Sequence, residues 1–348
     1  MKQRITALLL AALMVLGMTA CASDNSSDST AANASQNTSE STDSTESKTE
    51  KKVIGVMQYM QHDALDAAYQ GFQAALEDNG YADQVEYLYE NAQGDSNTLN
   101  TISDRFISDE VDLVLAIATP AAQTIAGKTT EIPILATAVT SFTEAKLVDS
   151  DENPGHNVSG TSDMNPVAEQ IALLKELVPD CETVGFLYAS NETNSVLQIK
   201  LAKEACDNLN LKYEEVTVTS TNDVQQAAQS LVGKCDAIYI PTDNVTAASM
   251  PIVSGVTEPE KIVTVCGEAG MVHSGGLVTM GLSYYDLGYQ TGLMAIEVLF
   301  NGADVSTMPV QYAAASDDIT FNGEYAAAIG FEIPEKYQEC IIYPSQEE

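Results

Sequence analysis

The chain has 348 residues and a formal net charge of −35 at pH 7, with 15 basic residues against 50 acidic ones. A surface this acidic repels nucleic acids and anionic lipid headgroups, so partners of these two kinds are disfavoured. The three histidines and six cysteines show no spacing typical of a metal site, and no phosphate-binding loop or catalytic motif joins a strand to a helix. We therefore expect no metal, no cofactor and no nucleic-acid partner.

Residues 1–20 have the features of a lipoprotein signal peptide. Lys2 and Arg4 precede an apolar run over residues 5–16, and small residues then lead to Cys21. The run is too short to span a bilayer of about 30 Å, so we expect it to be removed. Cys21 would then carry lipid, such as palmitate, and anchor the protein at the outer face of the cytoplasmic membrane. An ordinary signal peptide followed by a chance cysteine is the alternative.

Residues 21–51 are rich in Ser, Thr, Asp, Asn and Glu and predict a disordered tether, because they offer almost no apolar surface to bury. The remaining part of the chain, about 300 residues, is long enough for two domains. It contains an odd number of cysteines, which does not imply a complete disulfide framework. These cysteines are Cys181, Cys206, Cys235, Cys266 and Cys340. We expect most of them to be buried thiols, and one disulfide among them remains possible.

From residue 53 onward, short apolar runs alternate with amphipathic segments, which predicts parallel sheets covered by helices. A first series of strands is expected at residues 53–58, 85–89, 111–118 and 132–137. A second series is expected at residues 183–189, 213–218, 237–240 and 262–266, with helices over 194–209 and 223–232. The fold class is therefore α/β.

The two series match at a fixed offset of 124 residues. Ser96 then falls on Ser220, Asp112 on Asp236, and Thr119 on Asp243. This match predicts two similar lobes, although a shared pattern without common descent remains open.

The end of the chain predicts several crossings between the lobes. We expect a strand over residues 277–284, a helix over 286–300, a strand over 309–315 and a helix that follows Asn322 and ends at Gly330. These elements must complete one lobe and then return to the other, which makes a hinge. The expected boundaries are residues 52–160 with 284–314 for lobe 1, and residues 161–283 with 315–348 for lobe 2.

In parallel sheets, ligands bind beyond the carboxyl ends of the strands. In lobe 1 the loops at these ends supply the candidates Gln58, Tyr59, Thr119, Pro120, Ala121, Ala122, Thr137, Ala138 and Val139. Pro120 suits a first helical turn, and the Thr119 hydroxyl with the amides of Ala121 and Ala122 would form a pocket for a carboxylate. Simple N-capping by Thr119 is the alternative.

In lobe 2 the corresponding candidates are Asn191, Glu192, Asn194, Asp243 and Glu268, and Tyr284 is an aromatic candidate near the same cleft. Asp243 occupies the position equivalent to Thr119, so one lobe would bind the carboxylate and the other the ammonium group of an amino acid. An N-cap is the alternative for Asp243, as is an exposed charge for Glu268. His62 could contact the ligand, but we expect a surface-loop histidine.

At these loops the sequence resembles the ABC-transporter substrate-binding lipoproteins of the tryptophan/tyrosine-binding type. The resemblance extends from about residue 52 to 334. Its motifs are the residue 118–123 loop, the 157–160 turn, the 185–188 strand with the 192–195 segment, and the 241–244 loop. It implies two Rossmann-like lobes joined by a multi-strand hinge, the type I periplasmic-binding-protein fold.

The resemblance further implies capture of a small solute outside the cell by lobe closure and its delivery to an ABC permease with its ATPase. An aromatic amino acid is the ligand that we expect, and we expect a monomer. The chain contains no Trp, so Tyr or Phe must stack on the ligand. A binding protein for a sugar or nucleoside, or a ligand-loaded sensor for a membrane receptor, remains an alternative. We do not expect an enzyme.

Overall fold

The computed structural model describes residues 51–312 and 318–346. The expected signal peptide, Cys21 and the tether up to residue 50 lie outside the described residues. Over the described ranges, no helix is both long enough and apolar enough to cross a membrane.

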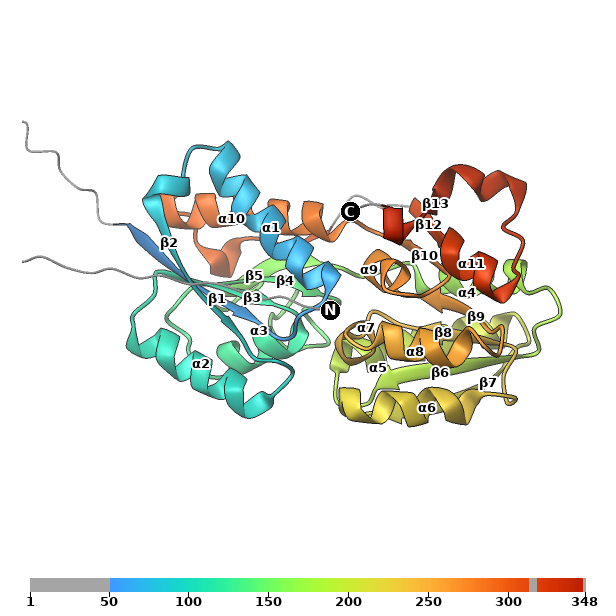
Figure 1. The fold of residues 1–348 in the computed structure, drawn as a ribbon. Coiled ribbons are helices and arrows are strands. Elements are labelled where there is room, and N and C mark those ends of the chain that lie inside the picture. Colours follow the sequence, from blue (N-terminus) through green and yellow to red (C-terminus); the bar gives the residue numbers. More distant parts are fainter. Residues whose placement is uncertain (1–50, 313–317, 347–348) are drawn as a thin grey trace, which may run out of the picture. The chain divides into compact units, whose positions relative to one another are not determined.

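The first sheet is parallel and has the strand order β11-β5-β4-β3-β1-β2 among the described strands (Figure 1). Its strands are β1 (Lys52–Gln58), β2 (Val85–Asn91), β3 (Leu113–Ile117), β4 (Ile134–Val139), β5 (Val158–Ser162) and β11 (Gln311–Tyr312). Its helices are α1 (Asp63–Asp78), α2 (Ser96–Ser108), α3 (Thr119–Ala126) and α10 (Tyr284–Asn301). Every residue of β3, β4 and β5 is buried, as expected for strands covered on both faces.

The second sheet has the order β13-β12-β10-β9-β8-β6-β7, and of its described pairs only β10 with β12 is antiparallel. Its strands are β6 (Thr183–Ala189), β7 (Lys212–Val218), β8 (Ala237–Ile240), β9 (Val263–Cys266), β10 (Val278–Gly281), β12 (Asp318–Asn322) and β13 (Ile341–Ile342). Its helices are α4 (Val167–Leu177), α5 (Thr193–Asn208), α6 (Val224–Leu231), α7 (Asn244–Ala247), α8 (Met250–Thr257), α9 (Ala269–His273) and α11 (Gly323–Ile329). Two mostly parallel α/β sheets confirm the expected fold class.

We propose that each sheet with its helices forms one lobe, as the sequence predicts. The chain passes between the sheets after β5, between β10 and α10, and between β11 and β12. The first of these passages begins two residues later than expected, because β5 continues to Ser162.

Two equivalent aspartates show how closely the lobes repeat. Asp112, just before β3, accepts a hydrogen bond from the backbone N–H of Val53 at 2.8 Å and donates its own N–H to the Val53 carbonyl. Asp236, just before β8, accepts from the N–H of Thr183 at 2.9 Å and donates to the Thr183 carbonyl. Each carboxylate thereby holds the start of the neighbouring strand, β1 in the first sheet and β6 in the second.

Several elements differ from the sequence-based expectations. Residues 157–160 were expected as a turn, but residues 158–160 are the first three residues of β5, in which Gly160 allows a close approach to the carbonyl of Ala136. Tyr284, expected to end a strand, begins α10, which Ser283 caps through its side chain. The sequence analysis missed α4, α8, β12 and β13. The five described cysteines are free thiols.

Helices α1 and α10 lie side by side in Figure 1 and pack at backbone contact. A Cβ atom built on Gly288 of α10 would lie 1.8 Å from the carbonyl oxygen of Ala68, and one on Gly71 of α1 would lie 1.9 Å from that of Tyr285. Glycine is therefore required at both positions for the two helices to approach this closely.

We expect Gly288→Ala to lower the free energy of unfolding by about 2 kcal/mol or more, because the added methyl group overlaps a rigid backbone atom. Gly255→Ala in α8 is the control, since nothing lies within 4 Å of the new Cβ, and it should raise stability slightly. Urea unfolding of both variants tests this difference. Equal stability of the two variants would contradict the tight helix contact.

Candidate functional site

The carboxyl ends of the strands carry unusual backbone geometry. Ala118, directly after β3, has φ of 84°, and Ala138, near the end of β4, has φ of 57°. Residues other than glycine adopt positive φ rarely, and strain of this kind is concentrated at functional sites. The backbone at this edge of lobe 1 is therefore shaped for more than strand pairing.

A narrow cavity of about 10 Å³ lies where these strand ends meet those of lobe 2. Its lining comes from loops and helices of both lobes, from β4 and from the passages between the sheets: His62, Leu65, Ala138, Thr140, Asp163, Asn194, Thr242, Asp243, Asn244, Ala247, Glu268, Met271 and Tyr284. Five of the predicted site residues are among them: Ala138, Asn194, Asp243, Glu268 and Tyr284. Hydrogen bonds join the two lobes around the cavity, from His62 to Asn244 at 3.1 Å and from Ser274 to Asp63 at 3.1 Å.

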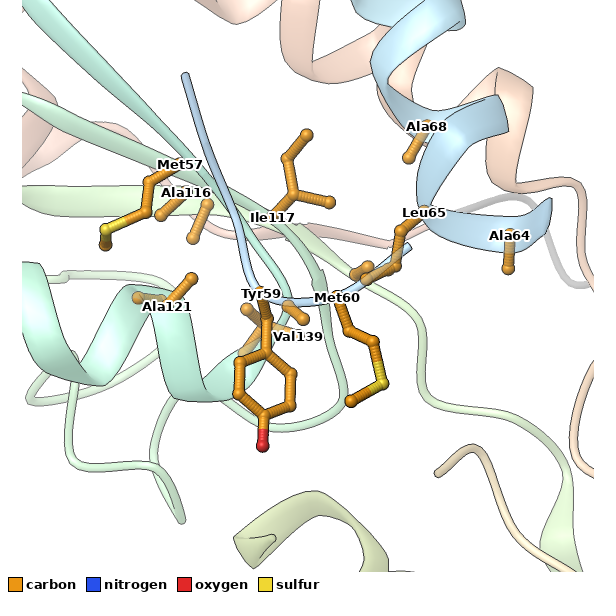
Figure 2. Packing of buried hydrophobic residues seen from close by; sticks show 14 of the residues in the cluster. Met57, Tyr59, Met60, Ala64, Leu65, Ala68, Ala116, Ile117, Ala121 and Val139 are labelled. Atoms are coloured by element: carbon orange, nitrogen blue, oxygen red, sulfur yellow. The ribbon is translucent and has the colours of Figure 1, made fainter. Parts of the chain in front are cut away.

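The other predicted site residues lie outside the cavity lining. They are Gln58, Tyr59, Thr119, Pro120, Ala121, Ala122, Thr137, Val139, Asn191 and Glu192. Gln58 donates from its amide to Asp66 at 2.7 Å, which ties the end of β1 to α1. Figure 2 shows that Tyr59 and Met60 direct their side chains to the same side of the loop between β1 and α1. The binding roles of this group remain predictions.

The sequence predicts a carboxylate pocket at the start of α3. Pro120 lies in the first turn of this helix, as expected, and Ala118 rather than Thr119 is its N-cap residue. The amide of Ala122 donates to the carbonyl of Ala118 at 3.1 Å, so it is already used within the helix. The Thr119 hydroxyl is buried without a hydrogen-bond partner, which rules out the alternative of simple N-capping.

Asp243 has a structural role that accounts for all of its acceptor capacity. Oδ2 accepts from the N–H of Ala189 and the hydroxyl of Ser195, both at 2.6 Å. Oδ1 accepts from the N–H and the hydroxyl of Thr246, both at 2.8 Å. Two bonds at each oxygen occupy its two lone pairs. Asp243 is therefore the N-cap of α7, which is the alternative role given for it in the sequence analysis. It also joins α7 to β6 and α5.

Unpartnered acceptors lie elsewhere in the cavity lining. Oδ1 of Asp163 and Oδ1 of Asn194 are buried and make no hydrogen bond, and neither does Nδ1 of His62. Buried polar atoms are normally hydrogen-bonded, so three such acceptors around one cavity indicate a site for a donor-rich ligand. The sequence analysis missed Asp163, because it follows a strand that was read as a turn.

Asp163 and Tyr284 meet where the chain passes between the lobes. The Tyr284 hydroxyl donates to Oδ2 of Asp163 at 2.7 Å, and both residues are buried. Burial raises the pKa of Asp163, although the hydrogen bonds with Tyr284 and Thr140 act in the opposite direction. A cation placed beside Oδ1 would offset this cost of burying a carboxylate.

Glu268 is buried at the start of α9, where its carboxylate accepts from the N–H groups of Gly270 and Met271. The alternative of an exposed charge is therefore wrong. Burial raises the pKa of Glu268 to about 7. With Asp163 and Asp243, it makes the cavity lining acidic, and no lysine or arginine is part of that lining.

Glu192 lies just behind the lining and holds two of its members. Its Oε2 accepts from the side-chain amides of Asn244 at 2.6 Å and Asn194 at 3.0 Å, while Oε1 has no partner. Burial and the nearby charge of Asp243 raise the pKa of Glu192 to about 8.

Comparison with known proteins gives a consistent result. The family described as "ABC transporter substrate binding protein" matches residues 53–339. A "Tyrosine-binding protein" of Clostridioides difficile (strain R20291) is 43% identical over 261 residues, which cover 74% of this chain and 75% of that protein. These matches confirm the resemblance inferred from the sequence. The matched family is a class of solute-binding proteins, which also confirms that the chain is not an enzyme.

Two solved structures extend the similarity to the fold. An ABC domain from Streptococcus pneumonia in complex with L-Trp has a TM-score of 0.81 at 35% identity, covering 84% of this chain and all 100% of that one. The ligand-free, open structure of a substrate binding protein with adhesive properties from Clostridium difficile has a TM-score of 0.64 at 43% identity, covering 84% of this chain and 98% of that one.

We expect Glu192→Gln to flatten the dependence of stability on pH. With a pKa raised from 4.5 to about 8, the folded protein keeps a proton that the unfolded chain has released, so the free energy of unfolding falls as pH rises between these values. One such proton corresponds to about 1.4 kcal/mol per pH unit. Urea unfolding at several pH values measures the slope.

Exposed Glu182→Gln is the control and should leave that slope unchanged. If Glu192→Gln unfolds with the same pH slope as the unmodified protein, Glu192 is ionised in the folded state and this prediction is wrong.

Proposed function

Because the chain belongs to the ABC transporter substrate-binding protein family, we propose that it captures an aromatic amino acid outside the cytoplasm for an ABC importer. The names of the relatives support the ligand class, since one is a tyrosine-binding protein and another is a domain in complex with L-Trp. The observation that carries the proposal is the pair of unpartnered buried acceptors in an acidic cavity, Asp163 and Asn194. An α-ammonium group has a positive charge and three N–H donors, which are enough to serve both acceptors.

The rest of the lining suits the other parts of an aromatic amino acid. Leu65, Ala138, Ala247 and Met271 offer apolar surface to a ring, and a methionine sulfur packs favourably against aromatic groups. The hydroxyls of Thr140 and Thr242 are uncharged donors that can face the carboxylate. In this proposal the ammonium lies at Asp163 rather than at Asp243, because the oxygens of Asp243 are already fully hydrogen-bonded.

Lobe closure is part of the proposal. The chain is structurally more similar to the L-Trp complex than to the ligand-free, open structure, although its sequence is more similar to the latter. Ligand contacts to both lobes would favour the closed form by their differential affinity for the two states.

We further propose that an ABC permease with its ATPase receives the amino acid and that the protein acts as a monomer. Lipid on Cys21 would keep it near that permease, while its acidic surface, at a formal net charge of −35, is repelled by anionic headgroups.

A thermal-shift screen tests the ligand class. L-tyrosine, L-tryptophan and L-phenylalanine should raise Tm, because binding to the folded state at about 100 times Kd adds about 2.7 kcal/mol of stability. Glucose and uridine should not, and 3-(4-hydroxyphenyl)propionate should fail because it lacks the ammonium group. Stabilisation by a sugar or nucleoside and by no amino acid would refute the proposal.

A pair of aspartate variants tests the placement of the ammonium group. Asp163→Asn keeps an acceptor for Tyr284 but removes the charge, so calorimetry should show at least about tenfold weaker amino-acid binding at nearly unchanged Tm. Asp243→Asn replaces one carboxylate oxygen by an NH₂ group, which would face two of the four donors that now bond to Asp243. This variant should therefore lower the free energy of unfolding. If Asp243→Asn weakens binding and Asp163→Asn does not, the ammonium group lies at Asp243 instead.

A further inference from the structure

His62 is the N-cap residue of α1 and belongs to the cavity lining. Its ring makes one hydrogen bond, from Nε2 to Oδ1 of Asn244 at 3.1 Å. The other ring nitrogen, Nδ1, is buried and has no hydrogen-bond partner. His62 makes no side-chain cap to α1, so the helix does not account for Nδ1.

The orientation of Asn244 follows from Glu192. Oε2 of Glu192 accepts from the backbone N–H of Asn244 at 3.3 Å as well as from its Nδ2 at 2.6 Å. Oε2 therefore acts as an acceptor whether or not Glu192 is ionised, because a proton can reside on the unpartnered Oε1. The amide nitrogen of Asn244 must then face Glu192, and its oxygen must face His62.

The tautomer of His62 follows from Asn244. An amide oxygen is an acceptor, so Nε2 of His62 must carry the proton that joins the two lobes. Burial lowers the pKa of His62, although Asn244 and the charges of Asp66, Asp63 and Asp243 act to raise it. The neutral ring then has a bare lone pair on Nδ1, which makes this atom an acceptor.

This acceptor has different bonding partners from Asp163, the charged member of the pair assigned to the ammonium group. Asp163 is bonded to Tyr284 at the passage between the lobes, whereas His62 is bonded to Asn244 at the start of α7. A zwitterion that places its ammonium group at Asp163 and Asn194 leaves Nδ1 for its side chain. A ring that carries a donor can pair with Nδ1, and a ring without one leaves a buried acceptor unpaired.

We infer that His62 is a specificity-determining residue that selects aromatic amino acids with an N–H or O–H donor on the ring, and that Glu192 and Asn244 are positioning residues that fix its tautomer. The inference rests on the proposed function. It favours tyrosine and tryptophan over phenylalanine by a directed hydrogen bond rather than by ring size.

Paired ligands that differ in one donor test the inference by calorimetry. L-tyrosine and L-phenylalanine differ in the phenol O–H, and L-tryptophan and 3-benzothienyl-L-alanine differ in the indole N–H. In the unmodified protein we expect the ligand with the donor to bind at least about tenfold more tightly in each pair. In His62→Phe, which keeps a ring and removes the acceptor, both ratios should fall to about one.

His156→Phe is the matched control, because His156 is exposed in lobe 1 and outside the cavity lining, and both ratios should stay as in the unmodified protein. Ratios near one in the unmodified protein, or ratios that survive His62→Phe, overturn the inference. Equal weakening of all four ligands by His62→Phe also overturns it, since His62 would then contact a group that the ligands share. If none of the four ligands binds the unmodified protein, the proposed function itself is wrong.

The tautomer has an independent readout that requires no stable variant. The chain has three histidines, so long-range ¹H–¹⁵N NMR can resolve each ring. We expect a His62 ring with a protonated Nε2 and a bare Nδ1, and a shift of the Nδ1 resonance on adding L-tyrosine but not on adding L-phenylalanine. A protonated Nδ1 in the unmodified protein, or the same shift with both ligands, would overturn the inference.

Discussion

The carboxylate of Asp243 is the interaction on which the lobe 2 side of the cavity depends. It accepts four hydrogen bonds, from the end of β6, from α5 and from the first turn of α7. These bonds hold Asn194, Thr242 and Asn244 in place, since all three are direct sequence neighbours of the residues involved. A buried carboxylate with four donors is expensive to disrupt, so this side chain fixes the part of the wall formed by β6, α5 and α7.

Much of the fold could be predicted because the apolar runs repeat. The offset of 124 residues identified Asp112 and Asp236 as equivalents, and in the structure each holds the start of the strand beside its own, β1 and β6 respectively. The strand β5 escaped prediction because Ser159, Gly160 and Thr161 are small and polar and resemble a turn. That strand is buried all the same, since Gly160 permits contact with the backbone of β4.

The candidate site was predictable only in part, for a related physical reason. Strand ends identified Asn194, Asp243 and Glu268 near the cavity, yet the side chains with unused acceptors depend on hydrogen-bond partners far away in the sequence. Asp163 follows the missed strand and is paired with Tyr284, which is 121 positions further along the chain. A local sequence pattern cannot show that the oxygens of Asp243 are fully hydrogen-bonded, whereas Asp163 has an acceptor without a partner.

The contact of α1 with α10 has a consequence for the cavity. His62 and Leu65 come from the beginning of α1, and Tyr284 is the first residue of α10. Since Gly71 and Gly288 bring the two helix backbones into direct contact, neither helix can slide or tilt without the other. The three side chains therefore keep their spacing, because neither helix can adjust to ligands of different bulk independently of the other.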